Sequence, residues 1–117
     1  MTGLTIYHNP NCSKSRATLA LLQQHGFKPR IVEYLSAPPT GVELDAIVRK
    51  LGIKSEQLVR TGEEIYKAKY AGKMLTDSDW IEAMVSDPVL IERPIVVRGD
   101  RAAIGRPPEN VLPLIAD

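Results

Sequence analysis

The chain has very few of the residues that stabilise small proteins through cross-links or metal ions. It contains one cysteine, Cys12, and two histidines, His8 and His25, among 117 residues. One cysteine cannot form a disulfide within the chain, and this set is too small for the usual cysteine-rich zinc sites. We therefore predict no bound metal. The fold must depend on an apolar core, and a chain of this length can bury roughly two thirds of its unfolded surface.

Long apolar runs and an excess of one charge are also absent. No stretch approaches the ~18 consecutive apolar residues of a membrane helix. Fifteen Lys and Arg against 14 Asp and Glu give a formal net charge of +1, whereas nucleic-acid-binding proteins are usually far more basic. The N-terminal residues lack the basic and apolar regions of a signal peptide. We expect a cytoplasmic protein without a membrane or nucleic-acid partner, and the mixed surface charge favours a monomer.

The N-terminal part has the pattern of a β-α-β unit. Residues 4–8 alternate apolar and polar side chains and predict a strand, which Asn9-Pro10-Asn11 interrupts. A helix is predicted over 13–25, ended by Gly26, and a second strand over 30–34. The expected apolar stripe of this helix consists of Ala17, Ala20, Leu21 and Leu22. A right-handed crossover then makes the two strands parallel.

Helices are predicted across the middle of the chain, about 40–88. Thr40 and Glu43 have the spacing of a capping box, and Thr76 and Asp79 offer a second helix start. The apolar residues of the first of these helices fall at i, i+3, i+4 and i+7: Leu44, Ile47, Val48 and Leu51. The apolar stripe of the later helix is Trp80, Ile81, Met84 and Val85. Shorter helices are expected over 55–71.

The C-terminal part predicts a hairpin followed by a helix. Residues 94–97 form a β-rich apolar run, Gly99-Asp100 favours a tight turn, and 101–104 can pair back. Pro107-Pro108 then begins a last helix. The order β-α-β, helices, β-β-α predicts one α/β domain over 1–117, with a mixed sheet and a helical insertion of about 40–88.

Cys12 follows the first predicted strand and immediately precedes the first predicted helix. Unpaired backbone N–H groups and the helix dipole favour a thiolate there, and such cysteines have pKa values of ~3.5–7.5 instead of ~8.5. Residues 1–30 also contain four Lys and Arg and no Asp or Glu. His8 could assist as an imidazolium, and the Ser15 hydroxyl as a hydrogen-bond donor to sulfur. Simpler roles stay open: Cys12 as a small buried hydrophobic residue, His8 as a polar residue with satisfied hydrogen bonds and Ser15 as a helix cap.

Several other cysteine and phosphate motifs do not fit. A phosphatase loop needs an arginine six positions after its cysteine, where this chain has Thr18. A dithiol redox motif needs a second cysteine at position 15, which is Ser15. There is no glycine-rich loop of the Walker type. The pattern therefore indicates a monothiol nucleophile that needs an external thiol to complete its cycle.

Five segments together resemble the glutaredoxin-dependent arsenate reductase family, the ArsC type. They are Tyr7-His-Asn-Pro-Asn-Cys-Ser-Lys-Ser-Arg16, Tyr34 with Pro38-Pro39, Leu58-Val-Arg60, Glu92-Arg-Pro-Ile-Val-Val97 and Ile104-Gly-Arg-Pro-Pro-Glu109. The similarity extends nearly from end to end, in the same order and spacing. It implies a thioredoxin-like fold, reduction of arsenate to arsenite, glutathione as co-substrate, glutaredoxin as partner and no bound cofactor.

The resemblance also implies roles for individual residues. Cys12 matches the family nucleophile, and His8 and Ser15 match the groups that tune it. The arginines that bind the oxyanion match Arg60, Arg93 and Arg106. Pro94 matches the proline expected in the cis form, although general frequencies alone favour trans. A solvated surface position stays open for each arginine taken singly.

Two other functions are compatible with these residues. One is a monothiol oxidoreductase that acts on glutathionylated proteins or on another oxyanion. The other is a non-enzymatic regulator, because a related branch with this fold binds RNA polymerase. Members of that branch usually carry a C-x-x-C redox switch, and Ser15 argues against it.

Overall fold

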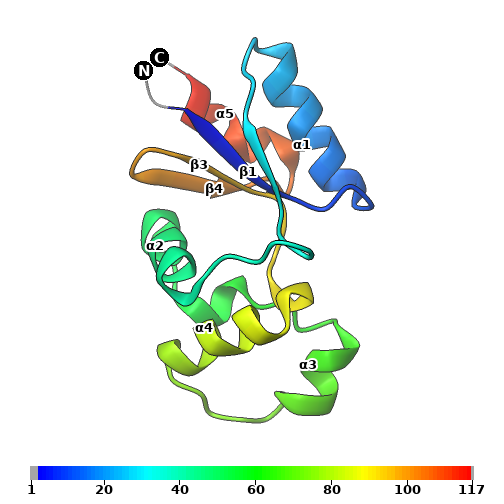
Figure 1. The fold of residues 1–117 in the computed structure, drawn as a ribbon, viewed down its shortest axis with the longest axis vertical. Coiled ribbons are helices and arrows are strands. Elements are labelled where there is room, and N and C mark those ends of the chain that lie inside the picture. The colour runs from blue at the N-terminus through cyan, green and yellow to red at the C-terminus, as the bar shows by residue number, and fades with distance from the viewer. Residues whose placement is uncertain (1–2, 117) are drawn as a thin grey trace. The chain divides into compact units, whose positions relative to one another are not determined.

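The computed structural model describes residues 3–116, which divide into two compact units (Figure 1). The first unit runs to Ala37 and resumes at Arg93, and the second consists of Pro38–Glu92. The insertion predicted at about 40–88 lies within the second unit. Its assignment, with the rest of 1–117, to a single domain stays a prediction.

A four-stranded mixed sheet forms the centre of the first unit. The strands are β1 (Leu4–His8), β2 (Arg30–Glu33), β3 (Ile95–Arg98) and β4 (Arg101–Ile104), in the order β2-β1-β3-β4. β1 is parallel to β2 and antiparallel to β3, and β3 is antiparallel to β4. The predicted α/β class and mixed sheet are thus confirmed. The central position of β1 brings its C-terminal end beside the start of β3.

One face of this sheet is covered by α1 (Ser13–Gln24), the 3-10 turn η3 (Pro108–Val111) and α5 (Leu112–Ile115). Alternate side chains of a strand point to the same face, so Leu4 and Ile6 both reach this core. Its buried members are Leu4, Ile6, Leu22, Val96, Val111, Leu114 and Ile115. This core holds α1 against the sheet and thereby fixes the position of the residue that precedes it, Cys12.

The buried face of α1 differs from the expected apolar stripe. Ala17 and Ala20 are exposed, whereas Ser15 and Thr18 are fully buried beside Leu22. The Thr18 hydroxyl donates to the Lys14 carbonyl at 2.8 Å, so its burial leaves no unpaired polar hydrogen. Hydrophobic spacing could not identify this face, because small hydrogen-bonding side chains line the first two turns.

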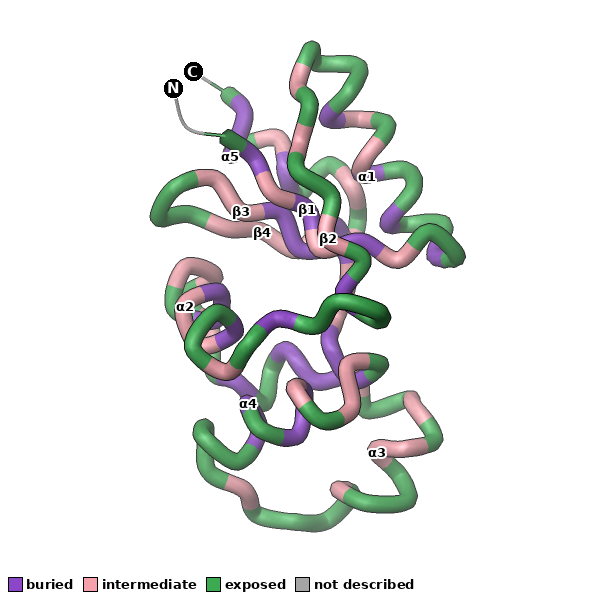
Figure 2. The backbone as a smooth tube through the Cα atoms, in the orientation of Figure 1, coloured by how far each residue is buried: buried purple, intermediate pink, exposed green. Residues whose placement is uncertain are grey.

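The second unit is helical. It contains α2 (Gly41–Leu51), η1 (Ser55–Leu58), α3 (Glu64–Lys69), α4 (Asp77–Ser86) and η2 (Pro88–Leu90). Buried residues lie mainly in α2 and α4 and in the turns beside α4, whereas α3 has no buried residue (Figure 2). The expected apolar residues of α2 are largely confirmed, since Leu44, Ile47 and Val48 are buried.

Both predicted helix starts in this unit are confirmed. Thr40 caps α2 by accepting from the Glu43 N–H at 3.1 Å, and the Glu43 side chain accepts from the Thr40 N–H at 2.9 Å. Thr76 and Asp79 make the same pair of bonds at the start of α4, both at 3.1 Å. Such reciprocal bonds satisfy backbone donors that a helix start leaves free. None of the helices described in residues 3–116 has both the length and the apolar character required to span a membrane.

Candidate active site

The loop between β1 and α1 holds Cys12 in a fixed backbone conformation. The Cys12 N–H donates to the Asn9 carbonyl at 3.0 Å, and the Asn11 N–H donates to Asn9 Oδ1 at 3.0 Å. Arg16 reaches back along the loop and donates from Nη1 to the Pro10 carbonyl at 2.9 Å. Cys12 itself has an extended conformation (φ −103°, ψ 123°) and is the N-cap of α1. These bonds place its sulfur at the start of the helix, as the sequence predicts.

Opposing influences act on the acidity of the Cys12 thiol. The residue is only 8% exposed, and burial, the largest single influence, raises the pKa of the thiol. The Ser15 N–H and the Arg93 side chain donate to the sulfur and lower this pKa. The Lys14 N–H and the Arg93 charge add to the lowering, so the pKa of Cys12 lies below its ordinary value. The helix start and an arginine together therefore favour the nucleophilic thiolate.

A second arginine lies at the same sulfur. Arg106 Nη2 donates to Cys12 Sγ at 3.4 Å, although the two residues are 94 positions apart in the chain. Arg106 Nε donates to the Arg93 carbonyl at 2.8 Å, which fixes the plane of the guanidinium. The structure thus brings Arg93 and Arg106 together at Cys12. A thiolate between two guanidiniums can receive a tetrahedral oxyanion, because each guanidinium can donate two hydrogen bonds to its oxygens.

His8 and Ser15 lie beside this loop and contact each other. His8 Nδ1 and Ser15 Oγ are 2.6 Å apart, and both residues are buried. Burial is the main influence on the pKa of His8 and lowers it; the Arg16 charge lowers it further, and the Glu33 carboxylate raises it. The net direction is downward, so the site disfavours the imidazolium considered for this position. The part that His8 takes in tuning Cys12 stays a prediction.

The contact between Ser15 and the sulfur also differs from the expected one. The Ser15 hydroxyl accepts from the Asn9 N–H at 3.0 Å and pairs with His8, as described above. The backbone N–H of Ser15 reaches the sulfur of Cys12 instead. Ser15 therefore joins the end of β1, the loop and the first turn of α1, and supports the thiolate through its main chain.

Arg60 belongs to the helical unit. It follows η1, and its N–H donates to the Leu90 carbonyl at 2.7 Å. Its guanidinium lies 3.5 Å from a Glu63 oxygen and 4.0 Å from a Glu92 oxygen, with 21% of the side chain exposed. Two carboxylates thus accompany this arginine within its own unit. Its expected part in oxyanion binding stays a prediction.

Pro94 has the conformation that the resemblance implies. The Arg93–Pro94 peptide bond is cis, and so is Arg106–Pro107, for which the residues carry no predictive signal. Asn9, predicted only to interrupt the strand, has a further role. Its side chain accepts from the N–H two residues later, which is a common turn motif of asparagine and the signal that could have identified it.

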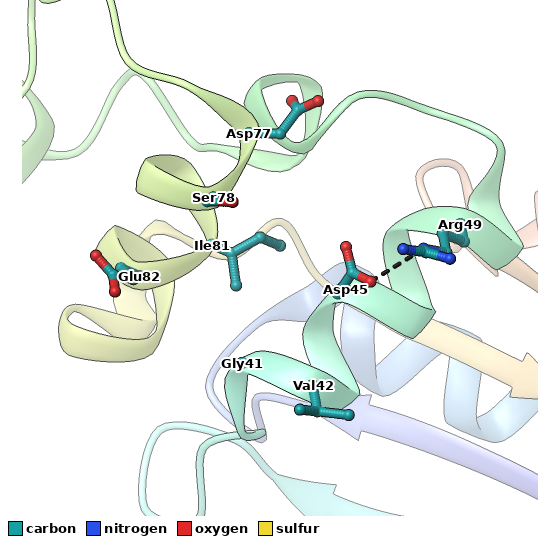
Figure 3. Close-up of a pocket in the computed structure, with 8 residues that line it drawn as sticks. All are labelled: Gly41, Val42, Asp45, Arg49, Asp77, Ser78, Ile81 and Glu82. Carbon is teal, nitrogen blue, oxygen red and sulfur yellow. Dashed lines mark ion pairs between the residues drawn. The ribbon is translucent and has the colours of Figure 1, made fainter.

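A separate hollow of about 460 Å3 lies between α2 and α4 of the helical unit (Figure 3). Asp45 and Arg49 form an ion pair of 3.0 Å at its edge. The lining residues are Gly41, Val42, Asp45, Arg49, Asp77, Ser78, Ile81 and Glu82. They include no thiol and no imidazole, so this hollow does not provide the chemistry found at Cys12. Within residues 3–116, no group of three or more metal-ligating side chains is found.

Alkylation of Cys12 should occur at lower pH than that of an ordinary cysteine. Because the site lowers the pKa of the thiol, we expect the pH midpoint of the iodoacetamide reaction to fall below that of the same thiol in the unfolded chain. The rate is measured by mass spectrometry of the intact chain over a range of pH. The same chain in denaturant provides the reference, and an equal or higher midpoint in the folded protein would contradict an activated thiolate.

The lowered pKa also predicts a pH-dependent contribution to stability. A group whose pKa is lower in the folded chain stabilises it fully above the ordinary pKa, and this stabilisation is lost as the pH falls through the folded value. The free energy of unfolding of the wild-type chain should therefore rise with pH between the pKa of Cys12 in the folded chain and its ordinary pKa. The Cys12→Ala variant should lack that part of the rise.

Comparisons with known proteins extend over both units. The chain matches the model of the ArsC family over residues 7–114. An arsenate reductase from Haemophilus influenzae is 47% identical over 115 residues, which cover 97% of this chain and 99% of that protein. Protein YfgD from Escherichia coli, described as uncharacterized, is 46% identical over 94% of each chain. The solved structure of an arsenate reductase from Vibrio cholerae has a TM-score of 0.92 and 45% identity, covering 96% of this chain and 97% of that one.

Proposed function

Because this chain belongs to the ArsC family, we propose that it is an arsenate reductase in which the Cys12 thiolate is the nucleophile. The observation that carries this proposal is the contact of 3.4 Å between Arg106 Nη2 and Cys12 Sγ, beside the Arg93 side chain. Arsenate is mainly a dianion near neutral pH and repels a thiolate. Two guanidiniums at the sulfur offset that repulsion, which a neutral electrophile would not require.

The first chemical step is substitution at arsenic. The Cys12 sulfur forms a bond to arsenic, and one arsenate oxygen leaves as water after protonation. The first-turn N–H groups of α1 and the guanidiniums of Arg93 and Arg106 stabilise the negative charge of the bound oxygens. His8 and Ser15 support the step by holding the loop, because the imidazole pairs with the hydroxyl of Ser15 while the N–H of Ser15 donates to the sulfur.

Two further thiols supply the electrons. Glutathione attacks the arsenic adduct, and glutaredoxin then removes the glutathione as a mixed disulfide. Two thiols thus become one disulfide, and the two electrons convert As(V) to As(III), which is released as arsenite with Cys12 restored. One active-site sulfur suffices for this cycle because both oxidised thiols come from outside the chain. Because glutathione and glutaredoxin act in a reducing compartment, we propose that the protein functions in the cytoplasm, as a monomer without a bound cofactor.

A coupled assay tests this function directly. Purified protein is mixed with arsenate, glutathione, glutaredoxin, glutathione reductase and NADPH, and NADPH oxidation is followed. We expect turnover that requires arsenate, glutathione and glutaredoxin, and arsenite as a product of equal amount. Replacing glutathione and glutaredoxin with thioredoxin and its reductase is expected to give no turnover.

A glutathione mixed disulfide, offered as an alternative substrate, distinguishes the proposal from its nearest rival. Reduction of that disulfide without any reduction of arsenate would indicate a monothiol oxidoreductase. Turnover with arsenate and thioredoxin alone would contradict the proposed electron donors and leave the oxyanion substrate in place.

A further inference from the structure

Gly105 lies where three segments around the active site approach one another closely. It follows β4 directly, precedes Arg106 and is buried. A Cβ atom at this position would overlap Thr18 Oγ1, and it would lie 3.0 Å from Thr18 Cγ2 and 2.9 Å from Pro94 Cγ. Real side chains do not tolerate such distances without movement of a neighbour. The segment that carries Arg106 can therefore rest on α1 and on Pro94 only because residue 105 has no side chain.

The need for glycine at this position comes from space and not from backbone conformation. The glycines with positive φ are Gly26, Gly52, Gly72 and Gly99, and Gly105 is not among them. An alanine at 105 would consequently have no conformational strain of its own. Its expected effect is confined to the displacement of Thr18, Pro94 or the segment that carries Arg106.

Hydrogen bonds fix the segment in this close position. The Gly105 N–H donates to the Pro94 carbonyl at 2.9 Å. The Thr18 hydroxyl lies 2.8 Å from the Lys14 carbonyl and 3.3 Å from the Gly105 carbonyl. It has a single hydrogen, so the Lys14 carbonyl is its main acceptor and the Gly105 carbonyl a secondary one. Steric contact, more than this shared hydrogen, thus sets the separation of Thr18 and Gly105.

Both partners of the contact at the sulfur depend on this packing. Cys12 is the N-cap of α1, and Thr18 lies in the second turn of the same helix. Arg106 directly follows Gly105 and is held further by Nε on the Arg93 carbonyl and by its own carbonyl, which accepts from Asn110 Nδ2 at 3.0 Å. A change in the distance from Gly105 to α1 is therefore expected to change the distance from the Arg106 guanidinium to the Cys12 sulfur.

We propose that Gly105 and Thr18 are positioning residues that hold the Arg106 guanidinium against the Cys12 sulfur. Both act through the spacing between α1 and the segment after β4. Their effect on oxyanion binding rests on the proposed function. Their effect on the reactivity of the thiol does not, and is measured without any substrate.

The test exchanges volume between the two positions. Gly105→Ala is expected to raise the pH midpoint of Cys12 alkylation toward that of the denatured chain. It should also weaken the protection of Cys12 from alkylation by bound arsenate, about tenfold or more, as expected for a displaced charged contact. Thr18→Ala, which leaves a gap beneath Gly105, should raise the midpoint by a smaller amount. In the double variant the new methyl group occupies the space that Thr18 vacates, so much of the midpoint shift should be reversed. Pro94 Cγ stays close, which makes the rescue partial.

The control is Gly3→Ala, because a Cβ there meets nothing within 4 Å. It should leave the alkylation profile unchanged, and thermal melting reports the stability of each variant. A folded Gly105→Ala protein with the wild-type midpoint would overturn the proposal. If Gly105→Ala does not fold, a wild-type midpoint in Thr18→Ala would overturn it as well. Additive effects in the double variant would also overturn it, since contacting residues must be coupled. If arsenate does not protect Cys12 of the wild-type chain from alkylation, that result contradicts the proposed substrate and leaves the positioning role of Gly105 and Thr18 untouched.

Discussion

Replacement of Cys12 by serine is expected to abolish arsenate reduction while the fold is retained. Serine has nearly the same shape as cysteine, and the loop bond from the residue 12 N–H to the Asn9 carbonyl does not involve the side chain. The hydroxyl, however, stays protonated at neutral pH and forms no adduct with arsenic that thiols can reduce. Because this chain has a single cysteine, no other sulfur can replace the nucleophile.

The coupled assay and circular dichroism check this expectation together. Ser13→Ala is the matched control, because it alters the adjacent exposed residue and leaves the backbone N–H groups of the first turn in place. Ser13→Ala should keep nearly full activity and Cys12→Ser should show none. Residual turnover above a few per cent in Cys12→Ser would contradict the assignment of the nucleophile.

Removal of the Arg106 guanidinium should produce the second largest loss of activity. Arg106→Ala deletes both the contact to Cys12 Sγ and the bond to the Arg93 carbonyl. A charge-assisted hydrogen bond contributes ~1.5–3 kcal/mol, so kcat/KM for arsenate should fall about tenfold to a hundredfold. Arg106→Lys should recover only part of this loss. A single ammonium cannot donate to the carbonyl and the sulfur with the spacing of a guanidinium.

The other arginines extend the same experiment. Arg93→Ala should cause a loss of similar size and should also raise the pH midpoint of alkylation, because the Arg93 side chain lowers the pKa of Cys12. Arg60→Ala is expected to weaken oxyanion handling as the resemblance implies. Arg49→Ala removes a guanidinium on the exposed surface of α2 and provides the control. Unchanged kinetics in all three site variants would show that these arginines belong to the surface and not to the reaction.

Local sequence signals predicted most of the secondary structure. Alternation in residues 4–8, the capping boxes at Thr40 and Thr76, and the Gly99-Asp100 turn all mark elements that the structure contains. Each of these signals acts between residues that are close in the chain, so their physical basis does not require knowledge of the rest of the fold. The same holds for Cys12, because its position at a helix start follows from the residues on either side.

Which side chains of a helix are buried was less predictable from the sequence. Ala17 and Ala20 have helical spacing but are exposed, and Thr18 is buried among residues far away in the sequence. Whether a small side chain is buried depends on which distant segment approaches the helix. Burial likewise lowers the pKa of His8, which inspection of its immediate neighbours in the chain could not establish.

The residues around Cys12 were enough to predict the nucleophile: a single cysteine at the start of a helix, in a segment with basic residues and no acidic ones. The groups that surround its sulfur depend on the packing of distant segments. The pairing of β1 with β3 brings Arg93 and Arg106 to a helix start at the opposite end of the chain, and Gly105 permits the close approach to α1. The two kinds of interaction differ in the sequence distance over which they act. Helix dipoles and caps act between residues that are close in the chain, whereas a guanidinium 94 residues away reaches the thiol only through the packing of the whole sheet unit.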